Sequence, residues 1–433
     1  MSSGNGMTSL HDLTATEIVR AIGSGHTTCE AVARSCLDHI EAREADVQAW
    51  QYLDPNQVIS QARDLDRRGV SGPLHGVPFG VKDIIDTYDM PTEYGSPIYR
   101  GHQPASDAAC VALSRQAGAV LMGKTVTTEF ANVHPGKTRH PLDPQRTPGG
   151  SSSGSGAAVG DHMVPLAIGT QTTASTIRPA SFCGVFGYRP SYGDLRCAGV
   201  KEAAGSLDTL GLIARSIEDI ALYREVLTRA NPSPLSAARA APPRIGFCRT
   251  HLWPRLEPYT AQLLEDAAAH LTKTDATVVE VTLPAELEHI GDFHRVISSY
   301  EFARNFTYEI ENHWDQISAA LRNGRIAAGL EYSVDHYHEA RQAAESCRRM
   351  LDDVFADFDV LLTASAAGEA PIGLHATGDP AFCALWTTAH VPAITLPVFS
   401  GPNGLPVGAQ LIGKRYADRA LLSTAQWVWQ HLT

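Results

Sequence analysis

The sequence has few of the features that mark a membrane, nucleic-acid-binding or exported protein. No apolar run among its 433 residues reaches the length that crosses a bilayer, and no basic run offsets the excess of 47 acidic over 35 basic residues. The start, Met1 to Thr8, has neither the charged nor the apolar part of a signal peptide. We therefore expect a cytoplasmic protein whose main partners include neither nucleic acid nor membrane.

Closely spaced cysteine pairs are also lacking. The eight cysteines form no C-x-x-C motif, so we predict reduced, mostly buried thiols and neither a disulfide framework nor a zinc site. They are Cys29, Cys36, Cys110, Cys183, Cys197, Cys248, Cys347 and Cys383.

What is present is the composition of a globular chain, 43% hydrophobic and 19% charged, long enough for a sizeable core. Two capping-box patterns, Thr14 to Glu17 and Thr27 to Glu30, predict an N-terminal helical layer over 1–70. A core over 71–230 follows, then one Pro/Ala/Ser-rich linker at 231–243 and a C-terminal part at 244–433.

Strands and helices are expected to alternate after the first layer, which indicates an α/β protein with a mixed sheet. The expected strands lie at 77–86, 119–122, 164–169, 183–188, 244–248, 277–281, 359–363, 391–397 and 408–413. The expected helices lie at 107–116, 216–229, 259–271 and 286–355, and loops are expected at 172–178 and 206–211.

The densest gathering of glycine and hydroxyl residues is GGSSSGSG at 149–156. Glycine lets the backbone take positive φ and lets other groups approach, while serine supplies donors, acceptors and nucleophiles. One interpretation is a flexible Gly/Ser linker. Apolar residues follow at once, however, so we expect the segment to abut buried elements as a site loop.

A lysine, Lys82, interrupts the apolar run at 77–85. It is either a surface lysine with a partly covered stem or a functional group held inside the protein.

Two motif matches are interpreted as coincidental. GAVLMGKT at 118–125 fits the phosphate-binding loop, but its four intervening residues form the apolar strand itself. GSSSG at 150–154 fits the nucleophile elbow of serine hydrolases, but the proline-flanked segment 144–148 before it cannot be a central strand.

Taken together, six segments resemble the amidase signature family, and the resemblance runs from the N-terminal helices to about residue 422. They are PLHGVPFGVKDIIDT (73–87), AGAVLMGKT (117–125), PGGSSSGSGAAV (148–159), GTQTTASTIRPASFCGVFGYRPSYG (169–193), SLDTLGLIARS (206–216) and GLPVGAQLIG (404–413). The resemblance implies a single α/β domain over 1–433, with a large twisted mixed sheet flanked by helices on both faces. It also implies hydrolysis of an amide or related bond, with no metal or organic cofactor.

The resemblance implies a Ser-cisSer-Lys triad. Ser175 falls where the family has its nucleophile, Ser151 where it has the serine after a cis peptide bond, and Lys82 where it has the general base. A lysine can accept the proton of a serine only when neutral, and its ordinary pKa is about 10.4, so burial must lower that pKa.

The oxyanion hole implied by the resemblance consists of the backbone amides of Thr172, Thr173, Ala174 and Ser175. Here the chain departs from the family, most of whose members have Gly-Gly or Ala-Gly before the nucleophile. If either position needed positive φ, Thr173 would be strained by about 1–2 kcal/mol.

Two further positions are expected to bind substrate. Arg178 follows the nucleophile by three positions, as in the malonamidase-like branch, where an arginine binds the substrate carboxylate. The alternative is a structural arginine. Ala131 lies on a segment that lines the acyl pocket in relatives. An aromatic-rich helical stretch at 289–337 is expected to form a lid, although its rings could equally be core.

The sequence therefore predicts an amidase for a small or aryl carboxylic amide, working through an acyl-enzyme. The alternatives are a carbamate (urethane) hydrolase, a glutaminase-type amidotransferase subunit, and an inactive binding protein with the family fold. A homodimer is expected only from the family.

Overall fold

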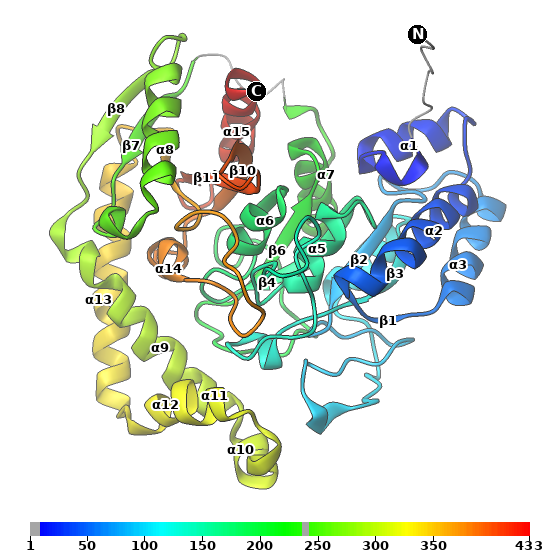
Figure 1. Cartoon of the computed structure of the whole chain (residues 1–433), viewed down its shortest axis with the longest axis horizontal. Coiled ribbons are helices and arrows are strands. Elements are labelled where there is room, and N and C mark those ends of the chain that lie inside the picture. The colour runs from blue at the N-terminus through cyan, green and yellow to red at the C-terminus, as the bar shows by residue number, and fades with distance from the viewer. Residues whose placement is uncertain (1–8, 236–241) are drawn as a thin grey trace.

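The fold is organised around one mixed sheet (Figure 1). The computed structural model describes residues 9–235 and 242–433. Eleven strands have the order β1-β3-β2-β4-β6-β5-β10-β11-β9-β7-β8. They are β1 (Trp50–Leu53), β2 (Pro78–Lys82), β3 (Val120–Thr125), β4 (Leu166–Gln171), β5 (Phe186–Arg189), β6 (Thr209–Ala214), β7 (Arg244–Cys248), β8 (Thr277–Val281), β9 (Val360–Ala364), β10 (Ala393–Ser400) and β11 (Pro406–Gly413). Helices flank this sheet on both faces, so the predicted fold class is confirmed.

The N-terminal layer consists of α1 (Ala15–Gly23), α2 (Cys29–Val47) and α3 (Pro55–Arg68). Thr14 and Glu17 form the predicted capping box. The second predicted box is wrong: Thr28, not Thr27, caps α2 by accepting from the Ala31 amide. The layer is not wholly helical either, because β1 lies between α2 and α3 and pairs antiparallel with β3.

Three parallel strands form the part of the sheet that carries the site. β2 lies between β3 and β4 and pairs in parallel with both, and every residue of the three strands is buried. Such strands are continuous apolar runs because both faces are covered. Their carboxyl ends lie at the same edge, where loops of α/β sheets commonly form sites.

The predicted loop at 149–156 is partly helical. Helix α5 (Ser153–Gly160) begins inside it, so the flexible-linker interpretation is wrong. A Cβ on Gly154 would collide with the Ala49 carbonyl oxygen, which shows that this glycine allows close packing against the chain that enters β1. Gly149, with φ of 83°, is the glycine here that needs the left-handed region.

Two other expectations in the core were wrong. The predicted loop 172–178 ends early, because α6 (Ile177–Cys183) begins within it and Pro179 is tolerated in its first turn. The predicted loop 206–211 contains the start of β6, which pairs antiparallel with β4 and β5. The predicted helices are present as α4 (Ala109–Gln116) and α7 (Ile217–Thr228).

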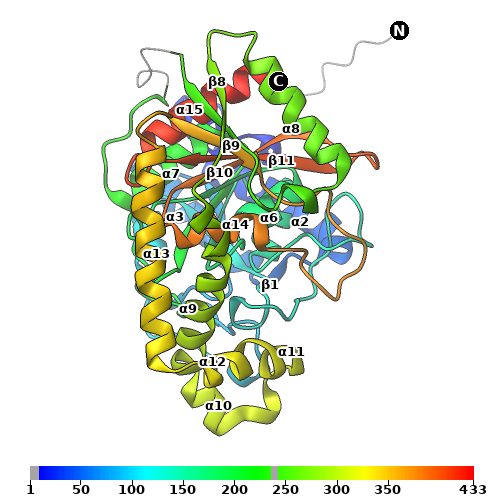
Figure 2. The same ribbon diagram turned by 90° about the vertical axis from the view of Figure 1, so that its left-hand side faces the viewer.

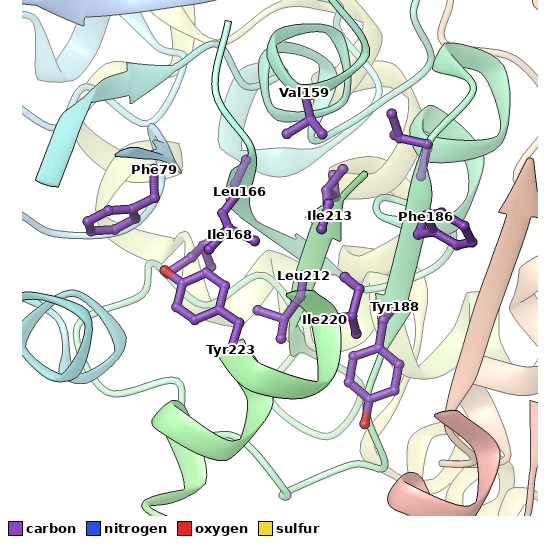
Figure 3. Close-up of a cluster of buried hydrophobic side chains, with 14 of the residues drawn as sticks. Phe79, Val159, Leu166, Ile168, Phe186, Tyr188, Leu212, Ile213, Ile220 and Tyr223 are labelled. Atoms are coloured by element: carbon purple, nitrogen blue, oxygen red, sulfur yellow. The ribbon is translucent and has the colours of Figure 1, made fainter. Parts of the chain in front are cut away.

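The core between sheet and helix is filled by large side chains from several strands (Figure 3). Leu212 of β6 and Tyr188 of β5 lie in this cluster with Ile220 and Tyr223 of α7, and Phe79 of β2 contacts Tyr223 edge to face at 6.3 Å. This packing fixes β2 and β4, the strands on which the site residues depend.

The C-terminal part closes the sheet and extends away from it. α8 (Pro258–Leu271), α14 (Ala381–Thr388) and α15 (Asp418–Leu432) are short to medium helices, while α9 (Ile290–Asn305) and α13 (Val334–Val354) are long and packed together. Between them, α10 (Thr307–His313), α11 (Ala319–Leu321) and α12 (Ala327–Glu331) lie at the end of the molecule remote from β7 and β8 (Figures 1 and 2).

The aromatic residues of this helical stretch divide between core and surface. Phe302 and Phe306 are buried and stack at 4.2 Å, whereas Tyr308 is 60% and Trp314 40% exposed. Phe306 also contacts Phe130 at 4.7 Å, which connects the helical stretch to the segment around Ala131.

The remaining sequence expectations concern the cysteines, membrane-spanning helices and the segments that lie outside the described residues. All eight cysteines are free, and seven of them are buried. No helix in the described ranges is long and apolar enough to cross a membrane. The start of the chain and residues 236–241 of the predicted linker lie outside the described residues, while 231–235 run as a mostly exposed loop.

Candidate functional site

Lys82 is the last residue of β2 and is fully buried. Its Nζ lies 2.8 Å from Ser151 Oγ and 2.7 Å from Thr170 Oγ1, the latter on the neighbouring strand β4. A neutral amine has two N–H groups and one lone pair, so Lys82 can donate to Thr170 while it accepts from Ser151. The surface-lysine interpretation is therefore wrong.

Burial lowers the pKa of Lys82 from its ordinary value of 10.5 to about 7, and the negative charge of Asp208 opposes this decrease. The cause is desolvation, because the charged ammonium loses its water when the strand is covered on both faces. A lysine with such a pKa is partly neutral near pH 7 and can act as a general base.

Ser151 follows a cis peptide bond from Gly150, as the resemblance implied. Its carbonyl oxygen accepts from the Thr128 amide at 3.3 Å, and the preceding Gly150 carbonyl oxygen accepts from Arg178 Nη2 at 2.6 Å. The Ser151 backbone is thus held on both sides, and its hydroxyl points to Lys82.

Ser175 lies in the loop between β4 and α6 and is 7% exposed. The Gln171 side chain accepts from the amides of Thr176 and Ile177 at 3.0 and 3.1 Å, which shapes this loop from inside. The Ser152 amide donates to the Ser175 carbonyl oxygen at 3.2 Å, so the two serine loops lie side by side. Within the described residues Ser175 Oγ makes no hydrogen bond, and catalytic hydrogen bonds commonly tighten only when substrate is bound.

The amides expected to form the oxyanion hole are free of hydrogen bonds to the described part of the protein. Across the part of the chain that the structure describes, the N–H groups of Thr172, Thr173, Ala174 and Ser175 donate to no protein acceptor. Neither Thr173 nor Ala174 has positive φ, so the strain considered for a β-branched residue at this place does not arise. The departure from Gly-Gly is therefore compatible with the loop geometry.

Side chains of α14 and α9 hold the loop between β4 and α6 in place. Thr387 Oγ1 donates to the Thr173 carbonyl oxygen at 2.8 Å, and His294 Nε2 lies 2.9 Å from the Thr172 carbonyl oxygen. Burial lowers the pKa of His294 to about 4, so this ring is neutral and donates. The hydroxyl of Thr172 donates to Asp208 at 2.5 Å, and burial raises the pKa of Asp208 to about 6.

Arg178 makes internal contacts. Its guanidinium donates to the carbonyl oxygens of Gly150 and Gly378 at 2.6 and 2.8 Å and to Thr377 Oγ1 at 3.0 Å. These bonds favour the structural alternative, in which Arg178 positions the peptide next to Ser151. Ala131 is buried with φ of 55° at the end of the short helix η3 (Glu129–Ala131).

Three residues of this site were not predicted from the sequence: Thr170, Asp208 and His294. Thr170 had a usable signal, because it follows the apolar run of β4 at the edge where parallel strands end. Asp208 lies in a segment that was interpreted as a loop, and His294 had no local signal. The phosphate-loop motif is indeed coincidental, since Lys124 is buried within β3 and donates to Thr92 Oγ1 at 2.7 Å.

Within the described ranges, no three His, Cys, Asp or Glu side chains lie together as a metal site would require. The buried lysine, the two serines and the free amides are groups that an acyl-transfer site requires. A family model described as Amidase matches residues 31–422, and the chain belongs to this family.

Similar proteins agree with this assignment along the whole chain. A Glutamyl-tRNA(Gln) amidotransferase subunit from Chloroflexus aggregans is 33% identical, with 96% of each chain covered. A solved amidase structure superposes with a TM-score of 0.89 at 29% identity, covering 97% of this chain and 100% of the other. A chain from a vestigial protein complex that reveals the evolutionary origins of an s-triazine catabolic enzyme superposes with a TM-score of 0.88 at 27% identity, covering 96% and 98%. The protein is thus an enzyme that acts on C–N bonds of amides.

Proposed function

We propose that the protein hydrolyses a small or aryl carboxylic amide, with Ser175 as nucleophile, Ser151 as proton relay and Lys82 as general base. The observation that carries this proposal is the 2.8 Å contact between Lys82 Nζ and Ser151 Oγ, made by a fully buried lysine. The adjacent loop supplies the Ser175 hydroxyl and the free amides of Thr172 to Ser175.

The acylation step follows from this arrangement. Neutral Lys82 accepts the proton of Ser151, Ser151 accepts that of Ser175, and Ser175 Oγ forms a bond to the carbonyl carbon. The resulting oxyanion accepts hydrogen bonds from amides of Thr172 to Ser175. When the tetrahedral intermediate collapses, the C–N bond breaks and the proton on Lys82 passes through Ser151 to the leaving nitrogen. Water then attacks the Ser175 ester by the same route, releasing the acid.

The test is release of ammonia or amine from short aliphatic amides, aryl anilides and aryl carbamates. Wild-type protein should hydrolyse at least one of them, and Ser175→Ala should lower the rate by about 10⁴-fold or more. The Ser175→Ala fold should be intact, because Ser175 Oγ makes no hydrogen bond among the described residues. Preference for carbamates would support the urethane hydrolase alternative.

A second candidate, the amidotransferase component, is supported by the 33% identical relative. Such a component is expected to need partner subunits for its full reaction. Turnover of simple amides by the purified chain alone, with glutamine no better than the other amides, would exclude this candidate. A cytoplasmic location and a homodimer stay predictions, which fractionation and sedimentation would test.

A further inference from the structure

A cavity of about 450 Å³ opens beside the nucleophile loop, the segment from Thr172 to Thr176. Small-molecule sites commonly have volumes of about 300–1,000 Å³. Residues of α9 and α14 form much of its wall. Among the described residues of the nucleophile loop, Thr173 lines this cavity and Ser175 does not. The Thr173 side chain therefore marks the border between the cavity and the proposed nucleophile.

The Thr173 side chain is held in one orientation. His294 Nε2 lies 3.2 Å from Thr173 Oγ1 and 2.9 Å from the Thr172 carbonyl oxygen. A carbonyl oxygen can only accept, so Nε2 of this neutral ring carries the proton and donates to both oxygens. Threonine is also stiff about its Cα–Cβ bond because it is branched at Cβ. The methyl group of Thr173 thus has a fixed position at the edge of the cavity.

The proton relay decides which half of the substrate faces Thr173. The leaving nitrogen has to lie at Ser151, which returns the proton to it. Lys82 and Thr128 contact Ser151. In the part of the chain that the structure describes, neither of these residues lines the cavity, and Ser151 does not line it either. The amine therefore lies on the Ser151 side, and the acyl group lies on the side of Thr173.

We propose that the Thr173 side chain limits the acyl group of the substrate, so that the enzyme prefers amides of short-chain acids over amides of long-chain or aromatic acids. Glycine at this position would leave the space of Cβ, Oγ1 and Cγ2 open and would join the cavity to the space above Ser175. The backbone of Thr173 does not have positive φ, so what the residue adds here is volume. The inference rests on the proposed amide hydrolysis and names the substrate class of that site.

An acyl series tests the size limit through kcat/KM for acetamide, hexanamide and benzamide. The wild-type enzyme should favour acetamide over each of the other two by at least about tenfold, because even one methylene that does not fit costs about 10- to 200-fold. Thr173→Gly should raise the ratio of hexanamide to acetamide by about 10- to 100-fold. Because the ratio is taken within one protein, a general loss of rate in the variant cancels.

The matched control is Thr173→Val, which keeps the branched volume and removes the hydroxyl. It should keep the wild-type ratio of hexanamide to acetamide. A second series varies the amine in place of the acid, with N-methylacetamide and N-hexylacetamide. The ratio within this series should stay within a few-fold of wild type in Thr173→Gly, because the amine lies on the Ser151 side.

Three results would overturn the inference. They are an unchanged ratio of hexanamide to acetamide in Thr173→Gly, an equal rise of the ratio in the amine series, and a Thr173→Val enzyme that behaves like Thr173→Gly. If Thr173→Gly fails to fold, Thr173→Ala decides, since it also removes Oγ1 and Cγ2, and a wild-type ratio in that variant would contradict the size limit.

Calorimetric binding of hexanamide separates this inference from the proposed reaction. The two proteins compared are Ser175→Ala and the double variant that also carries Thr173→Gly, and the double variant should bind at least about tenfold tighter. That result, in protein whose wild-type form hydrolyses nothing, would overturn the proposed function and leave the inference standing. Equal binding by the two proteins would overturn the inference, whatever the wild-type enzyme hydrolyses.

Discussion

The protonation of Lys82 should control the rate of amide hydrolysis. With a pKa of about 7, in place of its ordinary 10.5, the neutral fraction of Lys82 at pH 7 is on the order of a thousandfold larger than that of an exposed lysine. The base is inactive when protonated, so kcat/KM should rise with pH and reach half its plateau near pH 7. The ratio between about pH 8 and about pH 6 should be about tenfold.

Thr170 offers a matched perturbation of that profile. Its hydroxyl lies 2.7 Å from Lys82 Nζ and stabilises the charged form more than the neutral one. Hydrogen bonds to charged groups contribute about 1.5–3 kcal/mol, so Thr170→Val should move the midpoint to lower pH by about one unit. Thr170→Ser keeps the hydroxyl and should leave the midpoint in place.

The assay is kcat/KM for one neutral amide over about pH 5 to pH 9, in buffers of constant ionic strength. A flat profile, or a midpoint above about pH 9, would show that the rate does not depend on a buried lysine with a lowered pKa, and would refute the role of Lys82 as general base. A midpoint that is the same in Thr170→Val and wild type would refute the role given to Thr170.

Three other outcomes are expected. In steady-state kinetics, Ser151→Ala should lower kcat by at least about 100-fold while KM changes little, because the proton relay from Ser175 to Lys82 is removed. A change in KM alone would contradict this role. Arg178→Met should lower kcat by about 100-fold for neutral and carboxylate-bearing amides alike, because the Gly150 carbonyl loses its hydrogen bond and shifts. A loss confined to carboxylate-bearing substrates would show instead that Arg178 binds the substrate carboxylate. Gly154→Ala should lower the free energy of unfolding by about 2–3 kcal/mol in denaturant, because the new Cβ meets the Ala49 carbonyl oxygen. The control is Gly291→Ala in α9, which has open space around it and should raise the free energy of unfolding by up to about 1 kcal/mol. Equal effects of the two substitutions would refute the packing argument.

The strands that carry the site could be predicted from sequence because their physics is local. β2, β3 and β4 are buried on both faces and appear as apolar runs, and Lys82 is noticeable as the charge within such a run. The Thr14 capping box is likewise local. For the triad itself the apolar pattern was not enough, and the resemblance supplied Ser151 and Ser175.

The elements that were missed depend on tertiary contacts. β1 has four residues and exists because it pairs with β3, and the first residues of β6 contain a glycine that is typical of a loop. The helix α6 begins at Ile177 directly before Arg178 and Pro179, a pattern that signals a loop in isolation.

The most direct measurement is the mass of the enzyme quenched during turnover of a slowly deacylated aryl amide, followed by peptide mapping. We expect an acyl adduct on the peptide that contains Ser175, absent from Ser175→Ala protein, which should also release no amine. An adduct on another residue, or amine release by Ser175→Ala at the wild-type rate, would contradict the assignment of Ser175 as the nucleophile.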